Sequence, residues 1–571
     1  MKSNVLKELI DVANNRKEAD IVIKNAKVVD VYQAKIIEGD VAIYDKYIAG
    51  VGSYSGKQVI DANGGYLSPG FIDAHMHIES TYLSPSEAGR LLVPKGTTTV
   101  ITDPHEIVNV CGMEGLNYML EASTGSVLDI KYMLPSCVPC SPYETSGAVI
   151  TADDMIEPLK DGQILGLGEF MNFVGINYGN EEVLKKIEQA KLAGKIIDGH
   201  APGLTGSKLN GYIAAGIHTD HECSSIEEML DRISRGVYVL LREGSACHDL
   251  KYLIPGVTKD NSRYCALCSD DREPKTILEE GHIDGILRTC VKEGLDPFDA
   301  IRMATINAAE CYRLNDRGGI APGLLANLVI IDNLEEFNAQ KVFVNGQLVA
   351  EEGHYLKEVT TADIKSVSGS MNINDFSIDK LKLRCDVDDV YAIEVVEDGI
   401  LTKKTKVKIK RDENNLFLFE KESDLNKIAV VERHHGTGNV GVGLIKGFNV
   451  KDGAIAQTIA HDSHNVVVVG ASDEDMALAV KRLAEISGGI VVVKNGQVIS
   501  ELKLPIAGLM SDKTGQEVRE KFSALHKACH DELGVKEPEP IVKLSFMSLP
   551  VIPEIKITDK GLFDVEKFEF I

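Results

Sequence analysis

The segment at residues 66–80, YLSPGFIDAHMHIES, contains an apolar stretch that ends in two histidines, His75 and His77. Alternate residues of a β-strand point to the same face, so both imidazoles can reach a single metal ion. Two histidines at this spacing also arise by chance, as the polar end of an ordinary strand. The segment therefore raises a metal site as a hypothesis that other parts of the chain must support.

The region that follows, from about residue 69 to residue 320, alternates apolar strand-like bursts with helical stretches. In the stretch EEVLKKIEQAKLA, for example, the apolar residues are predicted to share one helix face. These residues are Val183, Leu184, Ile187 and Ala190. Strand–helix alternation of this length, with polar residues at the strand ends, is typical of a (β/α)8 barrel. We therefore predict an α/β protein with a TIM-like catalytic barrel at residues 69–320.

Strand patterns on both sides of the barrel predict a smaller domain built from two separate segments. Residues 1–68 are expected to form an N-terminal helix and the first part of a β-sandwich. Residues 321–356 are expected to form its second part, with a hairpin signal at Asn345-Gly346. Residues 370–571 carry further strand and helix patterns, and they are predicted to form a C-terminal α+β domain.

The composition is that of an ordinary globular protein with an acidic surface. Hydrophobic residues make up 44% of the chain, and the formal net charge is -25. Such a surface repels phosphate groups, so binding to nucleic acid or to an anionic membrane is not expected. No apolar run approaches the roughly 18 residues that cross a bilayer, and the 11 scattered cysteines are typical of reduced thiols. We expect a soluble, cytoplasmic protein.

Further histidines and carboxylates stand at the ends of the later predicted strands. They are Glu169, His200, His221 and Asp270. Each follows an apolar strand body, which places it at the barrel mouth, where enzymes of this architecture keep their active sites. Nitrogen and oxygen ligands together favour Zn, Fe or Mn. Unrelated capping residues would not repeat element by element, so these residues are predicted to bind metal together with His75 and His77.

The stretch ITDPHEIVN places Asp103, His105 and Glu106 at the end of the second predicted strand. All three are therefore candidates either for contact with a substrate or for support behind the metal ligands, and His105 and Glu106 are predicted to contact the substrate. The alternative is a loop that begins the next helix, with Asp103 as its N-cap.

Two histidine-rich strings, ERHHGTGN at 432–439 and AHDSHN at 460–465, stand out in the last third of the chain. One interpretation is that they approach the barrel mouth or hold a further ion, and His434 and His461 are predicted to contact the substrate. The alternative is that they are surface or interface histidines. Glycine-containing loops often carry function on a rigid scaffold, so we expect this domain to close over the mouth of its own or a neighbouring barrel.

Two CxxC pairs, Cys137 with Cys140 and Cys265 with Cys268, could in principle form a zinc site. The two pairs of such a site usually stand about 15–20 residues apart, and these pairs are much further apart in the chain. Packing of these cysteines in the core is therefore the prediction.

The segment at 66–80, the flanking β segments and the run GIAPGLLANLVIID at 319–332 resemble the amidohydrolase superfamily. The pattern of that family is His-x-His on strand 1, Lys or Glu on strand 4, His on strands 5 and 6, and Asp on strand 8. The matching residues are His75, His77, Glu169, His200, His221 and Asp270. The resemblance extends over roughly residues 18–355, and it implies the metal-dependent barrel of that family with a flanking β-sandwich.

Within that superfamily, the whole chain, including the two histidine-rich strings, most resembles the bacterial adenine deaminase family. The resemblance implies hydrolytic deamination of adenine to hypoxanthine and ammonia by a metal-activated hydroxide. It implies a centre of two divalent ions, with Mn or Fe favoured and Zn possible, in which Glu169 bridges the ions. Asp270 would take the proton of the hydroxide and deliver it to the departing amine. The expected partners are adenine as the small-molecule substrate and further copies of the chain, in a dimer or larger homo-oligomer.

The chain departs at one point from single-metal purine and pyrimidine deaminases, which usually carry a glutamate a few residues past the histidine of strand 5. Here His200 is followed by Ala-Pro-Gly. The catalytic residue that protonates the purine ring therefore stays open between Glu106 and Glu222. Two alternatives to adenine deamination also stay open: a cyclic-amide or N-acyl amidohydrolase on the same barrel, and a non-catalytic metal-binding assembly protein.

Overall fold

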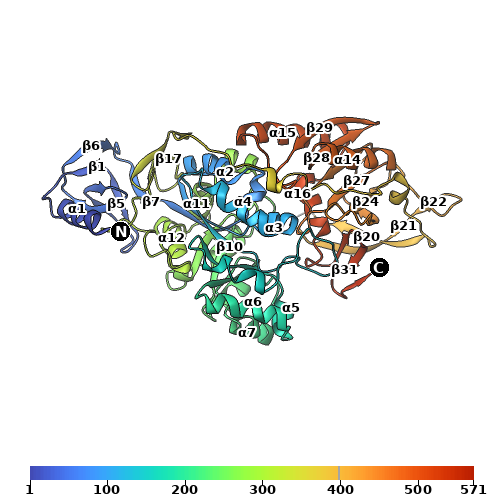
Figure 1. Cartoon of the computed structure of the whole chain (residues 1–571), viewed down its shortest axis with the longest axis horizontal. Helices are drawn as coiled ribbons and strands as arrows, with labels where there is room; N and C mark the ends of the chain where they lie inside the picture. The colour runs from blue at the N-terminus through green and yellow to red at the C-terminus, as the bar shows by residue number, and fades with distance from the viewer. Residues whose placement is uncertain (397–398) are drawn as a thin grey trace.

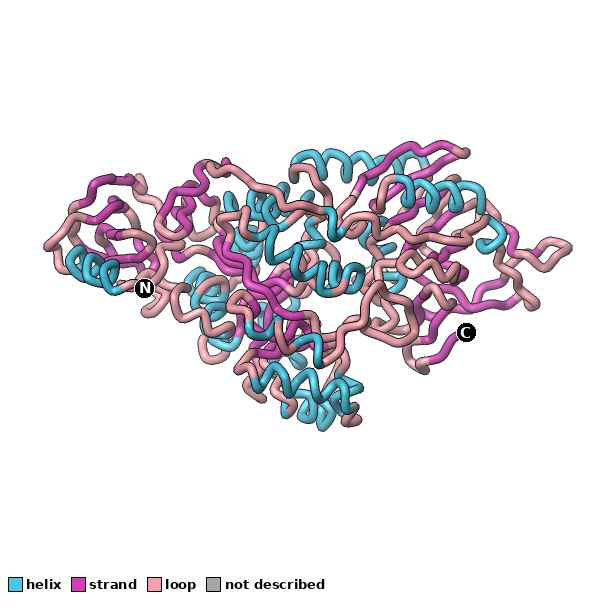
Figure 2. Tube along the Cα trace, viewed as in Figure 1, coloured by secondary structure: helices cyan, strands magenta, loops and turns pink. Residues whose placement is uncertain are grey.

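The computed structural model describes residues 1–396 and 399–571 and shows an elongated molecule (Figure 1). A small N-terminal β domain lies at one end, a parallel barrel in the middle and the C-terminal third of the chain at the other end. Figure 2 shows helices around the strands of the central part. None of the helices in the described part of the chain is long and apolar enough to cross a membrane.

Parallel strands form the barrel in two sheets. Their bounds are β8 (Phe71–Met76), β9 (Thr97–Thr102), β10 (Asp129–Leu134), β11 (Ile164–Phe170), β12 (Ile196–Gly199), β13 (Thr219–Asp220), β14 (Tyr238–Arg242) and β15 (Cys265–Cys268). The strand orders are β12-β11-β10-β9-β8 and β13-β14-β15. A parallel bridge between Met76 and Asp270 brings the chain after β15 beside the end of β8. The predicted α/β barrel is confirmed.

The barrel strands are covered on both of their faces, as is usual for parallel sheets. Every residue of β8 and β9 is buried. The covering helices include α2 (Pro85–Leu92), α4 (Met113–Ser123), α6 (Glu181–Leu192), α8 (Ile226–Ile233) and α11 (Ile283–Lys292). Asn180 caps α6 by accepting a hydrogen bond from the Val183 amide. Val183, Ile187 and Ala190 are buried, but Leu184 is 41% exposed. The prediction that Leu184 shares their face is therefore wrong, because the residue that directly follows Val183 points to a different side of the helix.

The two flanking segments pair into one small β domain, as the predicted fold requires. The first sheet has the order β5-β4-β1-β6, and the second has the order β19-β18-β17-β16-β7-β2-β3. The strands are β1 (Ala19–Lys24), β2 (Lys27–Asp30), β3 (Lys35–Glu38), β4 (Asp40–Tyr44), β5 (Tyr47–Gly52), β6 (Gly56–Asp61), β7 (Tyr66–Pro69), β16 (Leu328–Ile331), β17 (Ala339–Val344), β18 (Gln347–Glu351) and β19 (His354–Tyr355). Strand β16 runs antiparallel to β7, with Val329 opposite Ser68. A shared apolar core joins Ile23 of the first sheet to Leu67 and Phe343 of the second.

The C-terminal domain is built on a mixed sheet with the order β21-β20-β25-β24-β27-β26-β28-β29. Its main elements are β20 (Asp389–Val395), β21 (Thr402–Lys408), β24 (Leu425–Val431), β25 (Val440–Lys446), β26 (Ala454–Gln457), β27 (Val466–Gly470), α14 (Asp473–Glu485), β28 (Gly489–Lys494), β29 (Gln497–Lys503) and α15 (Gly515–Lys527). Successive residues of β27 face opposite sides. Val468 packs with Met476 of α14, whereas Val467 and Val469 belong to the core that continues into the barrel.

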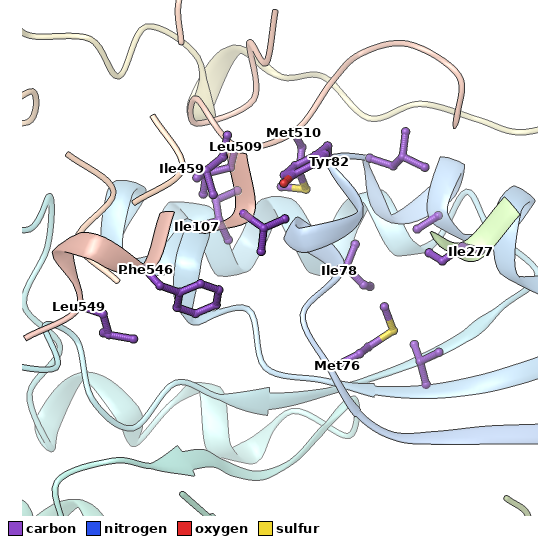
Figure 3. Packing of buried hydrophobic residues seen from close by; sticks show 14 of the residues in the cluster. Met76, Ile78, Tyr82, Ile107, Ile277, Ile459, Leu509, Met510, Phe546 and Leu549 are labelled. Carbon is purple, nitrogen blue, oxygen red and sulfur yellow. The ribbon is translucent and has the colours of Figure 1, made fainter. Parts of the chain in front are cut away.

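The C-terminal domain packs directly on the barrel mouth. Figure 3 shows Met510 of this domain beside Tyr82 of the barrel, and both belong to one buried cluster that also contains Ile459 and Phe546. The loop after β10 is also held across this contact, because the amide and hydroxyl of Thr145 donate to the Asp559 carboxylate at 2.9 and 2.7 Å. Residues of both domains therefore surround the C-terminal ends of the barrel strands.

A buried carboxylate ties the first barrel strand to the last one. Asp73 on β8 is fully buried, and its Oδ1 accepts the amides of His75 at 3.2 Å and Ser269 at 3.1 Å. Its Oδ2 accepts the Ser269 hydroxyl at 2.5 Å and lies 3.0 Å from Nε2 of His282. Asp73 thus fixes the backbone on both sides of the barrel seam, next to His75 and Asp270.

Replacing Asp73 with alanine should destabilise the barrel, because Ser269 would lose a buried acceptor and His282 would lose the carboxylate beside its ring. Loss of a buried, charged acceptor typically costs about 3 kcal/mol or more, so the thermal midpoint of the metal-free protein should fall clearly. As a control, Asp386→Ala removes a carboxylate that is 83% exposed and should change stability by less than about 0.5 kcal/mol. Equal midpoints for the two variants in scanning calorimetry would contradict this role of Asp73.

Candidate functional site

A cavity at the barrel mouth is lined by residues of both the barrel and the C-terminal domain. The barrel supplies imidazoles, carboxylates and one guanidinium; these are His77, His105, Glu106, Glu169, His200, His221, Glu222, Arg242, Asp270 and Asp271. The C-terminal domain supplies His461, Asp462, Phe546, Leu549 and Ile552. The structure thus brings most of the sequence-predicted site residues together around one cavity.

The first group of candidate ligands stands at the barrel seam. His77 Nε2 lies 3.1 Å from Asp270 Oδ1, and His75 Nε2 lies 3.5 Å from the same oxygen. Asp270 adopts a left-handed backbone conformation with φ of 54°, and its amide donates to the His75 carbonyl at 3.0 Å. Because these backbone contacts join β8 to the chain after β15, the two histidines and the aspartate are held as one unit.

The second group stands at the ends of β12 and β13. His200 Nδ1 and His221 Nε2 each lie 3.0 Å from Glu169 Oε2. The same glutamate also reaches the first group, because its Oε2 lies 3.8 Å from His75 Nε2 and its Oε1 lies 3.9 Å from His77 Nε2. Glu169 therefore stands between two sets of imidazoles, at the end of β11.

Asp103 lies behind these groups rather than at a helix N-cap. Its carboxylate Oδ2 accepts the Glu169 amide at 2.9 Å, and its carbonyl accepts Nδ1–H of His77 at 2.8 Å. Helix α3 (His105–Cys111) instead has Pro104 at its N-cap position, so the N-cap interpretation of Asp103 is wrong. Since Nδ1 of His77 carries the proton, the lone pair of the neutral ring is on Nε2 and faces Asp270 and Glu169.

The residues of both groups fit divalent metal ions. Among the described residues, both ring nitrogens of His75 and Nδ1 of His221 are buried without a hydrogen-bond partner. Imidazole lone pairs and carboxylate oxygens converge here, and such acceptors are costly to bury together unless a cation lies between them. The mixture of nitrogen and oxygen donors suits Zn, Fe or Mn. The hydrogen bond from the His77 ring to a carbonyl is also typical of metal-ligating histidines.

Arg242, at the end of β14, neutralises two of the buried carboxylates. Its guanidinium is paired with Glu222 and donates to Asp270 Oδ2 at 3.1 Å and to Asp249 Oδ2 at 2.8 Å. Burial would raise the pKa of Glu222, but Arg242 and His200 beside it hold that pKa well below its usual range. Arg242 therefore keeps Glu222 ionised and fixes one oxygen of Asp270.

His105 and Glu106 begin α3 and face the cavity. His105 Nδ1 lies 3.3 Å from Glu169 Oε1. Glu106 Oε1 accepts the Ser80 hydroxyl at 3.3 Å and lies 3.5 Å from His461 Nδ1. Burial, together with nearby carboxylates, raises the pKa of Glu106 well above its usual range.

The histidines of the C-terminal domain divide between the cavity and the domain interior. His461 lines the cavity, and its ring stacks on Phe546 with centroids 4.5 Å apart. His434 does not belong to the cavity lining of the described residues. Its Nε2 donates to the Ser463 carbonyl at 2.7 Å, and burial lowers its pKa to about 3. The structure therefore does not bring His434 to a position where it could contact a substrate.

A further histidine, His464, forms a buried group with Glu106 and His461 in which nitrogen and oxygen atoms lie within 4.8 Å of one another. The Ala460 amide, however, donates to His464 Nδ1 at 3.2 Å. The proton of the neutral ring must then sit on Nε2, so neither nitrogen offers a free lone pair. This group does not fit a metal ion, and the expectation of a further ion at the histidine-rich strings receives no support from it.

Sequence reasoning missed several residues of the cavity lining, among them Arg242, Asp462 and Phe546. Arg242 ends an apolar strand, which is the signal that pointed to Glu169 and Asp270, so it could have been found. Asp462 and Phe546 reach the cavity only through domain packing. The cysteines of both CxxC pairs are free and buried, as packing in the core predicts.

A barrel with these imidazoles and carboxylates at its mouth is the architecture of a metal-dependent amidohydrolase. A family model described as "Amidohydrolase family" matches residues 66–349, and one described as "Adenine deaminase C-terminal domain" matches residues 399–569. The chain belongs to the adenine deaminase family of amidohydrolases.

Full-length relatives and a solved structure accompany these matches. "Adenine deaminase 2" of Desulfotalea psychrophila is 54% identical over 100% of this chain and 99% of its own length. An adenine deaminase of Ligilactobacillus salivarius is 50% identical over 100% of this chain and 99% of its own length. The solved structure of a beta-aspartyl dipeptidase from Fervidobacterium islandicum is 18% identical with a TM-score of 0.44, over 59% of this chain and 98% of its own.

The Arg242 ion pairs give a prediction that is independent of any substrate. Arg242→Met should lower the stability of the metal-free protein by about 3–5 kcal/mol, because it leaves Glu222 and Asp270 buried without their cation. Arg242→Lys keeps the positive charge but not the planar guanidinium with its several donors. The stability of this variant should therefore lie between that of Arg242→Met and that of the wild type. Arg384→Met, at a position that is 71% exposed, is the control. If Arg242→Met unfolds at the wild-type denaturant midpoint, these ion pairs do not stabilise the site.

Proposed function

We propose that this protein hydrolyses adenine to hypoxanthine and ammonia at a centre of two divalent metal ions. The observation that carries the proposal is the position of Glu169, whose carboxylate faces one imidazole pair at 3.0 Å and the other at 3.8 and 3.9 Å. Support for adenine as the substrate comes from the full-length relatives, which are named adenine deaminases. Purine metabolism is the setting that this activity implies.

The proposed metal ligands follow the two groups in the cavity. His75, His77 and Asp270 would hold one ion, and His200 and His221 the other, with Glu169 between them. Divalent ions bound in this way lower the pKa of a water molecule from about 15.7 to about 7, which supplies a nucleophile at neutral pH. Mn or Fe is favoured and Zn is possible, since all three accept nitrogen and oxygen ligands.

Asp270 is the proposed proton carrier. Its Oδ2 is held by Arg242 at 3.1 Å, whereas its Oδ1 faces the cavity beside His77. That oxygen, which would also face the ion held with His75 and His77, can take a proton from the attacking water and pass it to the exocyclic nitrogen of adenine, which then leaves as ammonia. Arg242 prevents rotation of the carboxylate, so the same oxygen serves both transfers.

Glu106 is the proposed donor to the purine ring, which must gain a proton on N1 when water adds to C6. The proton that remains on the added hydroxyl returns to Glu106 when the C–N bond breaks and the C6 carbonyl forms. Glu222 is occupied by its ion pair with Arg242 and so remains a carboxylate that only accepts protons. Glu106 is held by the Ser80 hydroxyl and faces His461 instead. We therefore assign proton donation to Glu106, and we assign to Glu222 a hydrogen-bond acceptor role beside His200 and His221.

The wall formed by the C-terminal domain suits a flat aromatic substrate. Phe546 and His461 stack at an interplanar angle of 12°, and together they offer an aromatic edge above the barrel mouth. We propose that His461 contacts the bound purine and that the wall keeps bulk water from the opened ring.

We also propose that the protein is cytoplasmic and homo-oligomeric. Its cysteines are free in the structure, as in proteins of reducing compartments. Tyr178 is 78% exposed and Leu192 76% exposed, and Leu184 and Leu192 of α6 line the same surface hollow. An apolar surface of this kind is a candidate contact between copies of the chain.

The direct test is ammonia release by the purified, manganese-loaded protein. Adenine should be turned over far faster than dihydropyrimidines or N-acyl amino acids, which represent the cyclic-amide and N-acyl alternatives. The chelator-treated protein should lose this activity and regain it with Mn²⁺. Faster turnover of either alternative class would contradict the proposal, and metal binding without turnover of any of them would favour the assembly protein.

His461 and His434 should respond differently to substitution. His461→Ala removes part of the proposed purine wall, and a loss of about 1.4 kcal/mol of binding would raise KM for adenine about tenfold. His434→Ala should leave KM within twofold, because this ring lies outside the cavity lining. Steady-state kinetics on folded, metal-loaded variants provides the measurement. An equal rise in KM for both variants would show that the effect comes from the domain as a whole and not from contact with His461.

A further inference from the structure

His105 is the first residue of α3 and is only 4% exposed. Its Nδ1 lies 3.3 Å from Glu169 Oε1, and its ring stands edge-on to the His77 ring with centroids 4.7 Å apart. Among the described residues, this buried nitrogen has no hydrogen-bond partner. One ligand atom from each of His77, His105 and Glu169 lies within 4.8 Å of the other two. His105 thus has the surroundings of the candidate ligands, although the sequence suggests only a substrate contact.

The other ring nitrogen of His105 faces a carboxylate of the C-terminal domain. His105 Nε2 lies 3.7 Å from Asp462 Oδ1, and Asp462 is 2% exposed. A carboxylate beside Nε2 favours the ring form that carries its proton there, which leaves the lone pair on Nδ1. That lone pair then points at a carboxylate oxygen of Glu169, and two such acceptors at this distance repel each other unless a positive charge lies between them.

We propose that His105 is an additional metal ligand through Nδ1 and that Asp462 is the positioning residue that fixes its ring form. A histidine that binds metal through one nitrogen and donates the other N–H to a carboxylate is a recurrent arrangement in metal sites. Here the carboxylate comes from a different domain, so the C-terminal domain takes part in holding the metal centre. The assignment rests on the proposed metal centre but is independent of adenine as the substrate.

The test measures metal affinity rather than turnover. Full-length wild type, His105→Ala, His105→Asn, Asp462→Ala and Asp462→Asn are stripped of metal and titrated with Mn²⁺ against a chelating dye. The Co²⁺-loaded forms are compared by visible absorption, which reports the ligands directly. His435→Ala is the matched control, because His435 also crosses the domain contact, with Nε2 2.9 Å from the Ser146 carbonyl, and is not part of the cavity lining.

Both His105 variants should bind one ion at least 100-fold more weakly and change the Co²⁺ spectrum. Asp462→Ala should weaken binding about 10–100-fold. Asp462→Asn should weaken it less, because its amide oxygen can still accept Nε2–H. His435→Ala should keep wild-type affinity. Thermal midpoints of the metal-free proteins identify any variant that fails to fold. If an alanine variant fails, the metal affinity of the corresponding asparagine variant is compared with that of the wild type instead.

Wild-type affinity and an unchanged Co²⁺ spectrum in either folded His105 variant would overturn the assignment of His105 as a ligand. That result would favour a protonated His105 that bridges Glu169 and Asp462 by charge. Wild-type affinity in Asp462→Ala would overturn the role of the C-terminal domain. Binding of fewer than two ions by the wild type would instead contradict the proposed two-ion centre, so the two failures can be told apart.

Discussion

The carboxylate of Glu169 is the contact around which the barrel mouth is arranged. It stands at the end of β11, between the imidazoles of the seam and those of β12 and β13. Asp103 ties it to the first group, because one residue accepts both the Glu169 amide and the His77 ring N–H. Burial would raise the pKa of Glu169, but His200, His221 and His105 around it hold that pKa well below its usual range. A single ionised side chain can therefore serve two cation sites.

The C-terminal domain extends this arrangement beyond the barrel. The short loop that carries His461 and Asp462 reaches both the proposed substrate wall and the ring of His105. The Asn465 side chain donates a hydrogen bond to the Thr145 carbonyl at 2.7 Å, and this contact and the apolar cluster around Ile459 and Phe546 hold that loop in place. The six candidate ligands that the sequence indicates all come from the barrel. The second domain adds enclosure and, on our proposal, a contact that orients one more ligand.

The sequence predicts the barrel and places the candidate ligands at its mouth because both follow from local patterns. Apolar strand bodies with polar ends place His75, Glu169 and Asp270 at one rim without any knowledge of packing. Contacts between distant segments leave no such pattern. The sequence therefore gives no reason to separate His461, which lines the cavity, from His434, which bonds to the Ser463 carbonyl inside its own domain. The error at Asp103 has the same origin, since its carboxylate binds the Glu169 amide rather than its own helix.

The central claim is that Glu169 joins two ion sites, and a metal titration of Glu169→Ala against the wild type tests it most directly. Equilibrium dialysis of the metal-free proteins with Mn²⁺, followed by elemental analysis, gives the number of ions bound per chain. The account predicts two ions in the wild type and at most one tightly bound ion in the variant, with both proteins folded. Two ions held with wild-type affinity by Glu169→Ala would contradict the account.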